Sequence, residues 1–163
     1  MSRTKLLYIA GWGRSGSTLL GNILGQVPGV VHVGEMVYLW ERGLANPNWK
    51  CGCGASIREC RFWRDVLERT FGTMNDIPYR ELVAYQKRSI RVRHTPLLLS
   101  SLGRSFLQRE IEPYLKTLGS LYRSIADVDK AQLIVDTSKI PGYGGVLSMV
   151  PELDVSVVLL VRD

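Results

Sequence analysis

A glycine-rich stretch at 11–20, GWGRSGSTLL, carries the residues best suited to chemistry by type and spacing. Two of its glycines have the spacing of the phosphate-binding loop of nucleotide hydrolases, G-x-x-x-x-G-K-[ST], and Thr18 closes that pattern, but Ser17 stands in place of the lysine. Backbone N–H groups of such a loop point at one spot beside the positive end of a helix dipole. Arg14 adds a permanent, forked positive charge. We therefore expect the loop to bind an oxyanion smaller than a magnesium-bound triphosphate. The predicted ligands are Gly13, Arg14, Ser15, Gly16, Ser17 and Thr18.

The elements around this loop follow from hydrophobic patterning. Short apolar runs predict strands over 5–10, 30–33, 132–136 and 154–161, the last of them rich in β-branched residues. Apolar residues at helical spacing predict helices after the loop and over 63–71, 78–92, 103–110, 113–126 and 142–150. The turn signals NPNW and CGCG make 36–62 irregular. Strand–loop–helix alternation at both ends predicts an α/β fold like that of phosphate-loop NTPases, with a parallel sheet and a helical insertion or cap at about 63–128 in a single domain.

Composition narrows the class of ligand. The 163 residues carry a net charge of +6, which favours an anionic ligand. No basic helix, zinc finger or RNA-binding aromatic motif accompanies the charge, so we expect no nucleic-acid partner. No apolar run reaches the roughly 18 residues that a membrane span needs, and no signal peptide begins the chain. A cytoplasmic protein is the expectation.

Three stretches together resemble one family. Residues 13–20 resemble the 5′-phosphosulfate-binding loop of sulfotransferases that use 3′-phosphoadenosine 5′-phosphosulfate (PAPS), and 51–63 and 134–163 resemble a bacterial branch of that family. The resemblance implies in-line transfer of a sulfuryl group from PAPS to a hydroxyl or amine of a small molecule, glycan or lipid, with 3′-phosphoadenosine 5′-phosphate (PAP) as product and no required metal. It covers the N-terminal half to two-thirds of a typical member. We therefore expect a truncated domain whose exposed last strand favours homodimerisation.

The resemblance assigns charged roles to residues in all three stretches. Arg14 should contact the 5′-phosphosulfate and stabilise the departing oxygen. Lys139, in DTSK, should approach the sulfuryl group, with Ser138 hydrogen-bonded near the cofactor. Arg162, in LVRD, should bind the 3′-phosphate of PAPS.

Glu35 is the candidate general base. It follows the predicted strand 30–33, at the edge where a parallel sheet places its ligands. Related sulfotransferases carry a glutamate at a similar spacing beyond the loop, and burial would prepare a carboxylate to accept a proton. His94 is the reserve base. His32, three residues before Glu35, should point to the opposite face and pack in the core.

Two other functions fit the loop. One is an ATP-dependent kinase or NTPase with a degenerate phosphate loop, which would need magnesium and a carboxylate such as Asp136 to hold it. The other is a non-catalytic fragment that binds an anionic nucleotide or a protein. The missing loop lysine argues against the first.

Cys51, Cys53 and Cys60 follow a C-x-C-x6-C spacing. Three thiols would bind zinc with a fourth ligand, for which His94 is the recruit that the sequence offers. A disulfide between two of them and three buried free thiols that shape a loop are the alternatives.

Overall fold

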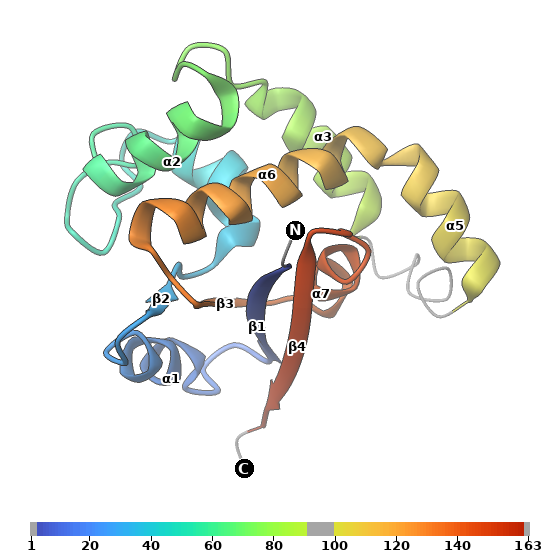
Figure 1. Cartoon of the computed structure of the whole chain (residues 1–163), viewed down its shortest axis with the longest axis horizontal. Coiled ribbons are helices and arrows are strands. Elements are labelled where there is room, and N and C mark those ends of the chain that lie inside the picture. Colours follow the sequence, from blue (N-terminus) through green and yellow to red (C-terminus); the bar gives the residue numbers. More distant parts are fainter. Residues whose placement is uncertain (1–2, 91–99, 162–163) are drawn as a thin grey trace.

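Four parallel strands form the sheet of the computed structural model, which describes residues 3–90 and 100–161. The strands are β1 (Thr4–Gly11), β2 (Val30–His32), β3 (Leu133–Lys139) and β4 (Leu153–Leu160). Their order is β2-β3-β1-β4, and all three pairings are parallel (Figure 1). The predicted α/β fold with a parallel sheet is confirmed.

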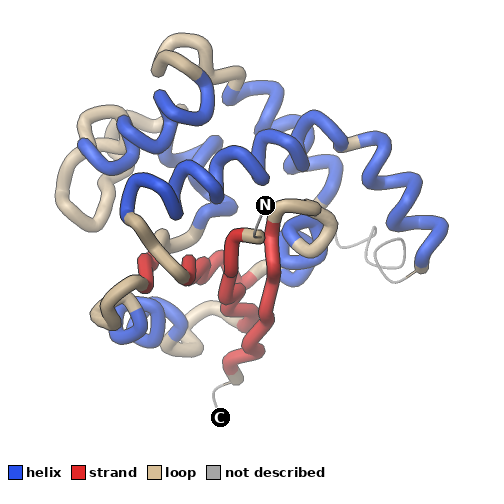
Figure 2. Tube along the Cα trace, in the orientation of Figure 1, coloured by secondary structure: helices blue, strands red, loops and turns tan. Residues whose placement is uncertain are grey.

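Helices cover both sides of the sheet, as Figure 2 shows. They are α1 (Ser17–Leu24), the 3-10 helix η1 (Met36–Tyr38), the π-helix η2 (Leu39–Leu44), α2 (Arg61–Phe71), α3 (Tyr79–Ser89), α5 (Ser101–Glu110), α6 (Glu112–Asp129) and α7 (Pro141–Leu147). Helices α2, α3, α5 and α6 gather on one side of the sheet, and α1 lies on the other (Figure 1). Within the described residues, no helix combines the length and the apolar character that crossing a membrane requires.

Two sequence expectations about local structure were wrong. Residues 36–44 are helical rather than irregular, because Met36, Trp40 and Leu44 bury their side chains on one stripe of this segment. Strand β3 continues to Lys139 instead of ending at Asp136, so the aspartate lies in mid-strand. Residues 91 and 92, expected in the helix that begins near Pro78, lie outside the described residues.

The connections leave the sheet on opposite faces, which creates a place for a ligand. Helix α1 follows β1 and packs on β2 and β3, whereas α7 follows β3 and packs on β1 and β4. Gly144 of α7 lies against the ring of Tyr8 in β1, which marks one face; Gly21 of α1 lies against His32 in β2, which marks the other. The loops after β1 and β3 therefore diverge at neighbouring carboxyl ends, the position where open parallel sheets bind ligands.

Candidate functional site

The glycine-rich loop joins β1 to the N-terminus of α1. Gly16 precedes the helix at φ 90°, a conformation that favours glycine, and Arg14 adopts φ 65° within the loop. Gly13 and Arg14 are exposed, as is Thr18, whereas the Ser17 side chain is buried, with 2% of the residue exposed. Among the residues described, no side chain caps the first turn of α1. Its backbone donors are therefore available to an anion.

A buried hydroxyl and a cavity accompany the loop. Ser15 Oγ is buried and has no hydrogen-bond partner in the described part of the chain, a state that costs about 1–3 kcal/mol. A cavity of about 520 Å³ opens beside it, lined by residues 11–15, Pro141 and residues 159–161. The loop after β1, the first residue of α7 and the end of β4 thus surround one hollow, and Ser15, whose hydroxyl has no partner within the described residues, is one of its lining residues.

Trp12 is a residue of this hollow that the sequence reasoning missed. The residue is 86% exposed and lines the cavity. An exposed indole is uncommon on a protein surface and suits stacking on a planar ring. Its position between two glycines of the loop was the signal available in the sequence.

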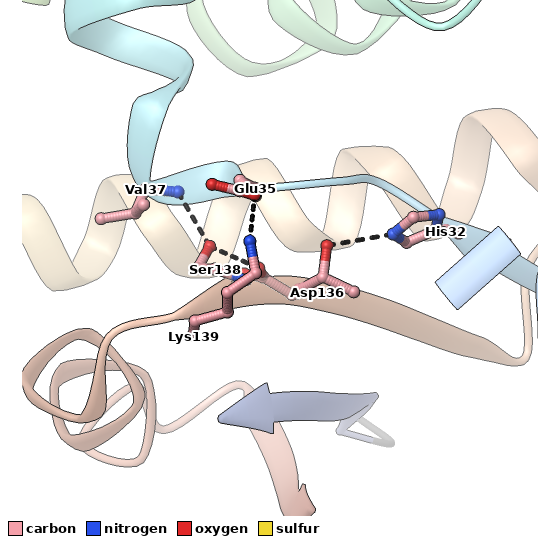
Figure 3. A network of polar contacts seen from close by, with 7 residues as sticks. His32, Glu35, Val37, Asp136, Ser138 and Lys139 are labelled. Atoms are coloured by element: carbon pink, nitrogen blue, oxygen red, sulfur yellow. Dashed lines mark hydrogen bonds and ion pairs between the residues drawn. The ribbon is translucent and has the colours of Figure 1, made fainter. Parts of the chain in front are cut away.

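Glu35 and Lys139 form an ion pair at the ends of β2 and β3. The Lys139 ammonium donates to Glu35 Oε1, and Figure 3 shows the two side chains pointing toward each other. The side chain of Lys139 is 18% exposed and that of Glu35 is 33% exposed, so the pair is partly shielded from water.

The register of the sheet aligns Lys139 of this pair with the end of β1, the strand that leads into the loop. Lys139 lies opposite Ala10, which is next to the last residue of β1. Lys139 has φ 68°, and Gly34, which directs the chain toward Glu35, has φ 73°. The cation of DTSK and the candidate base are therefore brought together: Lys139 ends β3, the strand next to β1, and Glu35 follows β2 on the far side of β3.

Arg14 and Lys139 share a left-handed backbone conformation. Among the described residues, the non-glycine positions with positive φ are Arg14, Lys130 and Lys139. Lys130 ends α6, where such a conformation is common. The other two are the cations predicted from the sequence. Backbone strain at residues that surrounding structure holds in place is frequent at functional sites.

Asp136 and Ser138 lie in a buried network behind the pair. Asp136 Oδ2 accepts a hydrogen bond from the Tyr122 hydroxyl at 2.6 Å, and Oδ1 accepts from Ser138 N at 2.8 Å and Ser138 Oγ at 2.5 Å. Burial raises the pKa of Asp136 to about 6, against these donated hydrogen bonds. Val37 N donates to Ser138 Oγ at 3.0 Å (Figure 3). Ser138 was expected to hydrogen-bond near the cofactor; in the structure the residue is 1% exposed and its hydroxyl bonds Asp136 and the amide of Val37.

Of the remaining predicted residues, the structure describes His32 but not His94 or Arg162. His32 packs under α1: its ring nitrogens lie 3.0 Å from Asn22 Oδ1 and 3.1 Å from Thr137 Oγ1. Burial lowers the pKa of His32, which favours the neutral ring. His94 and Arg162 lie outside the described residues.

Comparison of the chain with protein-family models, with curated proteins and with solved structures found no match. The functional argument therefore depends on the residues and their arrangement.

Proposed function

We propose that this protein transfers a sulfuryl group from PAPS to an acceptor hydroxyl or amine. The observation that carries the proposal is the placement of two strained cations, Arg14 and Lys139, after adjacent parallel strands, with Lys139 paired to Glu35. In this proposal a tetrahedral anion lies in the loop, in contact with Arg14, and the Lys139–Glu35 pair acts on it from the ends of the neighbouring strands. Sulfuryl transfer needs charge neutralisation and a proton acceptor at these places.

Each residue has a defined part in this proposal. The loop amides and Arg14 hold the 5′-phosphosulfate, and the Ser15 hydroxyl gains a partner. The acceptor oxygen bonds to sulfur as the bond from sulfur to the bridging oxygen breaks, and the acceptor proton passes to Glu35. Lys139 neutralises charge on the bridging oxygen. Because Glu35 holds Lys139 before ligand arrives, the incoming anion competes with Glu35 for the ammonium.

The kinase or NTPase alternative is weaker because of Asp136. This carboxylate was the candidate magnesium ligand, but it is 0% exposed, and both of its oxygens accept protein hydrogen bonds. A magnesium ion at the loop would have to take a carboxylate from elsewhere. Net charge and loop geometry fit binding without catalysis equally well, so a non-catalytic nucleotide-binding protein is distinguished only by turnover.

A pair of titrations tests the proposal. The chain is titrated calorimetrically with PAP and, separately, with ATP and magnesium. We expect PAP to bind and ATP with magnesium to bind at least tenfold more weakly. Preference for ATP with magnesium would favour the kinase alternative and refute the sulfotransferase proposal.

Turnover separates an enzyme from a binding protein. The native chain and Glu35→Gln are incubated with PAPS and a panel of phenol, sugar and amine acceptors, and PAP release is measured. We expect release from the native chain and a loss of about 100-fold or more in Glu35→Gln, the scale of general-base catalysis, with PAP still bound. PAP binding without acceptor-dependent release would favour the binding protein.

A further inference from the structure

The three cysteines, which the proposed function does not use, converge on one point. Cys51, Cys53 and Cys60 lie in the segment between η2 and α2, and their sulfur atoms are all within 4.8 Å of one another. Cys60 Sγ is 3.6 Å from Cys51 Sγ, well beyond the roughly 2.05 Å of a disulfide bond. All three are free thiols, with Cys60 buried and Cys53 exposed.

The backbone around the thiols is ordered by its own hydrogen bonds. Cys51 N donates to Ala55 O at 2.8 Å, and Gly54 N donates to Cys51 O at 2.8 Å. Gly54 has φ 88°, so this tight turn favours glycine. Cys51 and Cys53 belong to this turn, and Cys60 is the residue before α2.

Polar groups of the backbone also face the sulfur atoms. The amide of Ala55 lies at the sulfur of Cys53, and the amide of Trp63, in the first turn of α2, lies at the sulfur of Cys60. Amide donors of this kind stabilise the negative charge that zinc-bound sulfurs carry, and the positive end of a helix dipole acts in the same direction. Lys50, Arg58 and Arg61 adjoin the cysteines in sequence and offset the negative charge that thiolates would bring.

We propose that Cys51, Cys53 and Cys60 bind one zinc ion as thiolates. Zinc–sulfur bonds of about 2.3 Å at a tetrahedral angle separate two sulfurs by about 3.8 Å, close to the spacing of Cys51 and Cys60. Binding forms three zinc–sulfur bonds and releases the thiol protons to solvent, with no change of oxidation state. Because Cys53 is exposed, the fourth position opens to solvent and takes a water molecule.

The ion would fix the loop to the start of α2. That helix buries Trp63 and Val66, and its Thr70 donates to Ser124 Oγ of α6 at 3.0 Å. The same loop follows η2, and η1 and η2 together connect it to Glu35. Zinc would therefore stabilise the arrangement of the helical layer, as ligands that bind only the folded state do.

The full chain, reduced and stripped with a chelator, is titrated with zinc against a colorimetric competitor, and cobalt(II) serves as a spectroscopic probe. We expect one zinc per chain, a higher Tm with zinc, and cobalt spectra with thiolate charge-transfer bands and the intense visible bands of a tetrahedral site. Cys53→Ser should lower zinc affinity by 100-fold or more, and since its side chain is exposed, the variant should keep the native circular dichroism.

Ser56→Ala is the matched control, because it alters the same loop and keeps all three thiols. It removes the hydrogen bond that the Ser56 hydroxyl donates to Glu59. It should bind zinc as the native chain does. Failure of the reduced native chain to bind zinc would overturn the proposal. Equal zinc affinity in Cys53→Ser would do the same, as would a disulfide that forms in the metal-free protein and is not prevented by zinc.

Discussion

The left-handed backbone at Lys139 allows strain and charge to be tested separately. Lys139→Ala and Lys139→Gly both remove the ammonium that pairs with Glu35, but only glycine relieves the backbone at φ 68°. Left-handed backbone costs a residue with Cβ roughly 1–2 kcal/mol. Glycine avoids this cost, but the greater freedom it gives the unfolded chain lowers the gain in stability by about 0.5–1 kcal/mol. Lys139→Gly should therefore exceed Lys139→Ala in free energy of unfolding by about 0.5–1 kcal/mol, or about 2 °C in Tm for a chain of this size.

Lys130 provides the matched pair outside the site. It has φ 53° and ends α6, and its side chain is exposed. Lys130→Gly should exceed Lys130→Ala in stability by the same amount. Neither should change PAP affinity, whereas both Lys139 variants should weaken PAP binding about tenfold or more, since a hydrogen bond to a charged group contributes about 1.5–3 kcal/mol.

Urea unfolding and calorimetric titration of the four variants measure both quantities. Equal stability of Lys139→Ala and Lys139→Gly would show that the backbone there is not strained. Native PAP affinity in both Lys139 variants would remove Lys139 from the binding site. Weaker PAP binding by the Lys130 variants would show that the comparison measures general destabilisation.

Two more predictions follow from buried groups. Asp136 has its pKa raised to about 6 from an ordinary 3.8, so the folded chain keeps a proton between about pH 4 and pH 6 that the unfolded chain releases. The free energy of unfolding of the native chain, minus that of Asp136→Asn, should fall by about 3 kcal/mol as pH rises through this window and level off above it. A difference between the two chains that stays constant with pH in urea unfolding would contradict the raised pKa of Asp136. In Gly21→Ala the added Cβ would lie 2.4 Å from His32 Nε2, so the variant should lose about 1–3 kcal/mol, measured by urea unfolding. Most of that loss should disappear in a His32→Ala background, and an equal loss there would place the strain elsewhere.

The fold was largely readable because its signals are local. The apolar runs that became β1 and β4 are continuous, although β4, at the edge of the sheet, is mostly exposed, and the glycine-rich loop separates a strand from a helix over a few residues. Residues 36–44 were expected to be irregular because the turn signals at 46–54 follow them closely. The apolar spacing of Met36, Trp40 and Leu44 was visible in the sequence, but a 3-10 turn followed by a π-helix matches no single helical period.

The site was predicted as separate residues, and its contacts were not. Glu35 and Lys139 are 104 positions apart, so their pairing depends on β2 lying beside β3, which the sequence does not specify. The orientation of Ser138 depends on β3 continuing past Asp136. In a strand that ends at Lys139, alternation places Asp136 and Ser138 on the same buried face, toward Tyr122 of α6.

The missing loop lysine now has a structural explanation. Ser17 is 2% exposed, so the position that carries the lysine in nucleotide hydrolases gives a long side chain no direct path to solvent in this chain. Positive charge comes instead from Arg14 inside the loop and from Lys139 across the neighbouring strand, both held in left-handed backbone. In nucleotide hydrolases the lysine at this position reaches the β and γ phosphates of a triphosphate. In the proposed site, Arg14 and Lys139 would contact a smaller anion from the ends of adjacent strands, and Glu35, which pairs with Lys139, would supply the carboxylate. That combination suits transfer of a sulfuryl group to an acceptor better than hydrolysis of a magnesium-bound triphosphate.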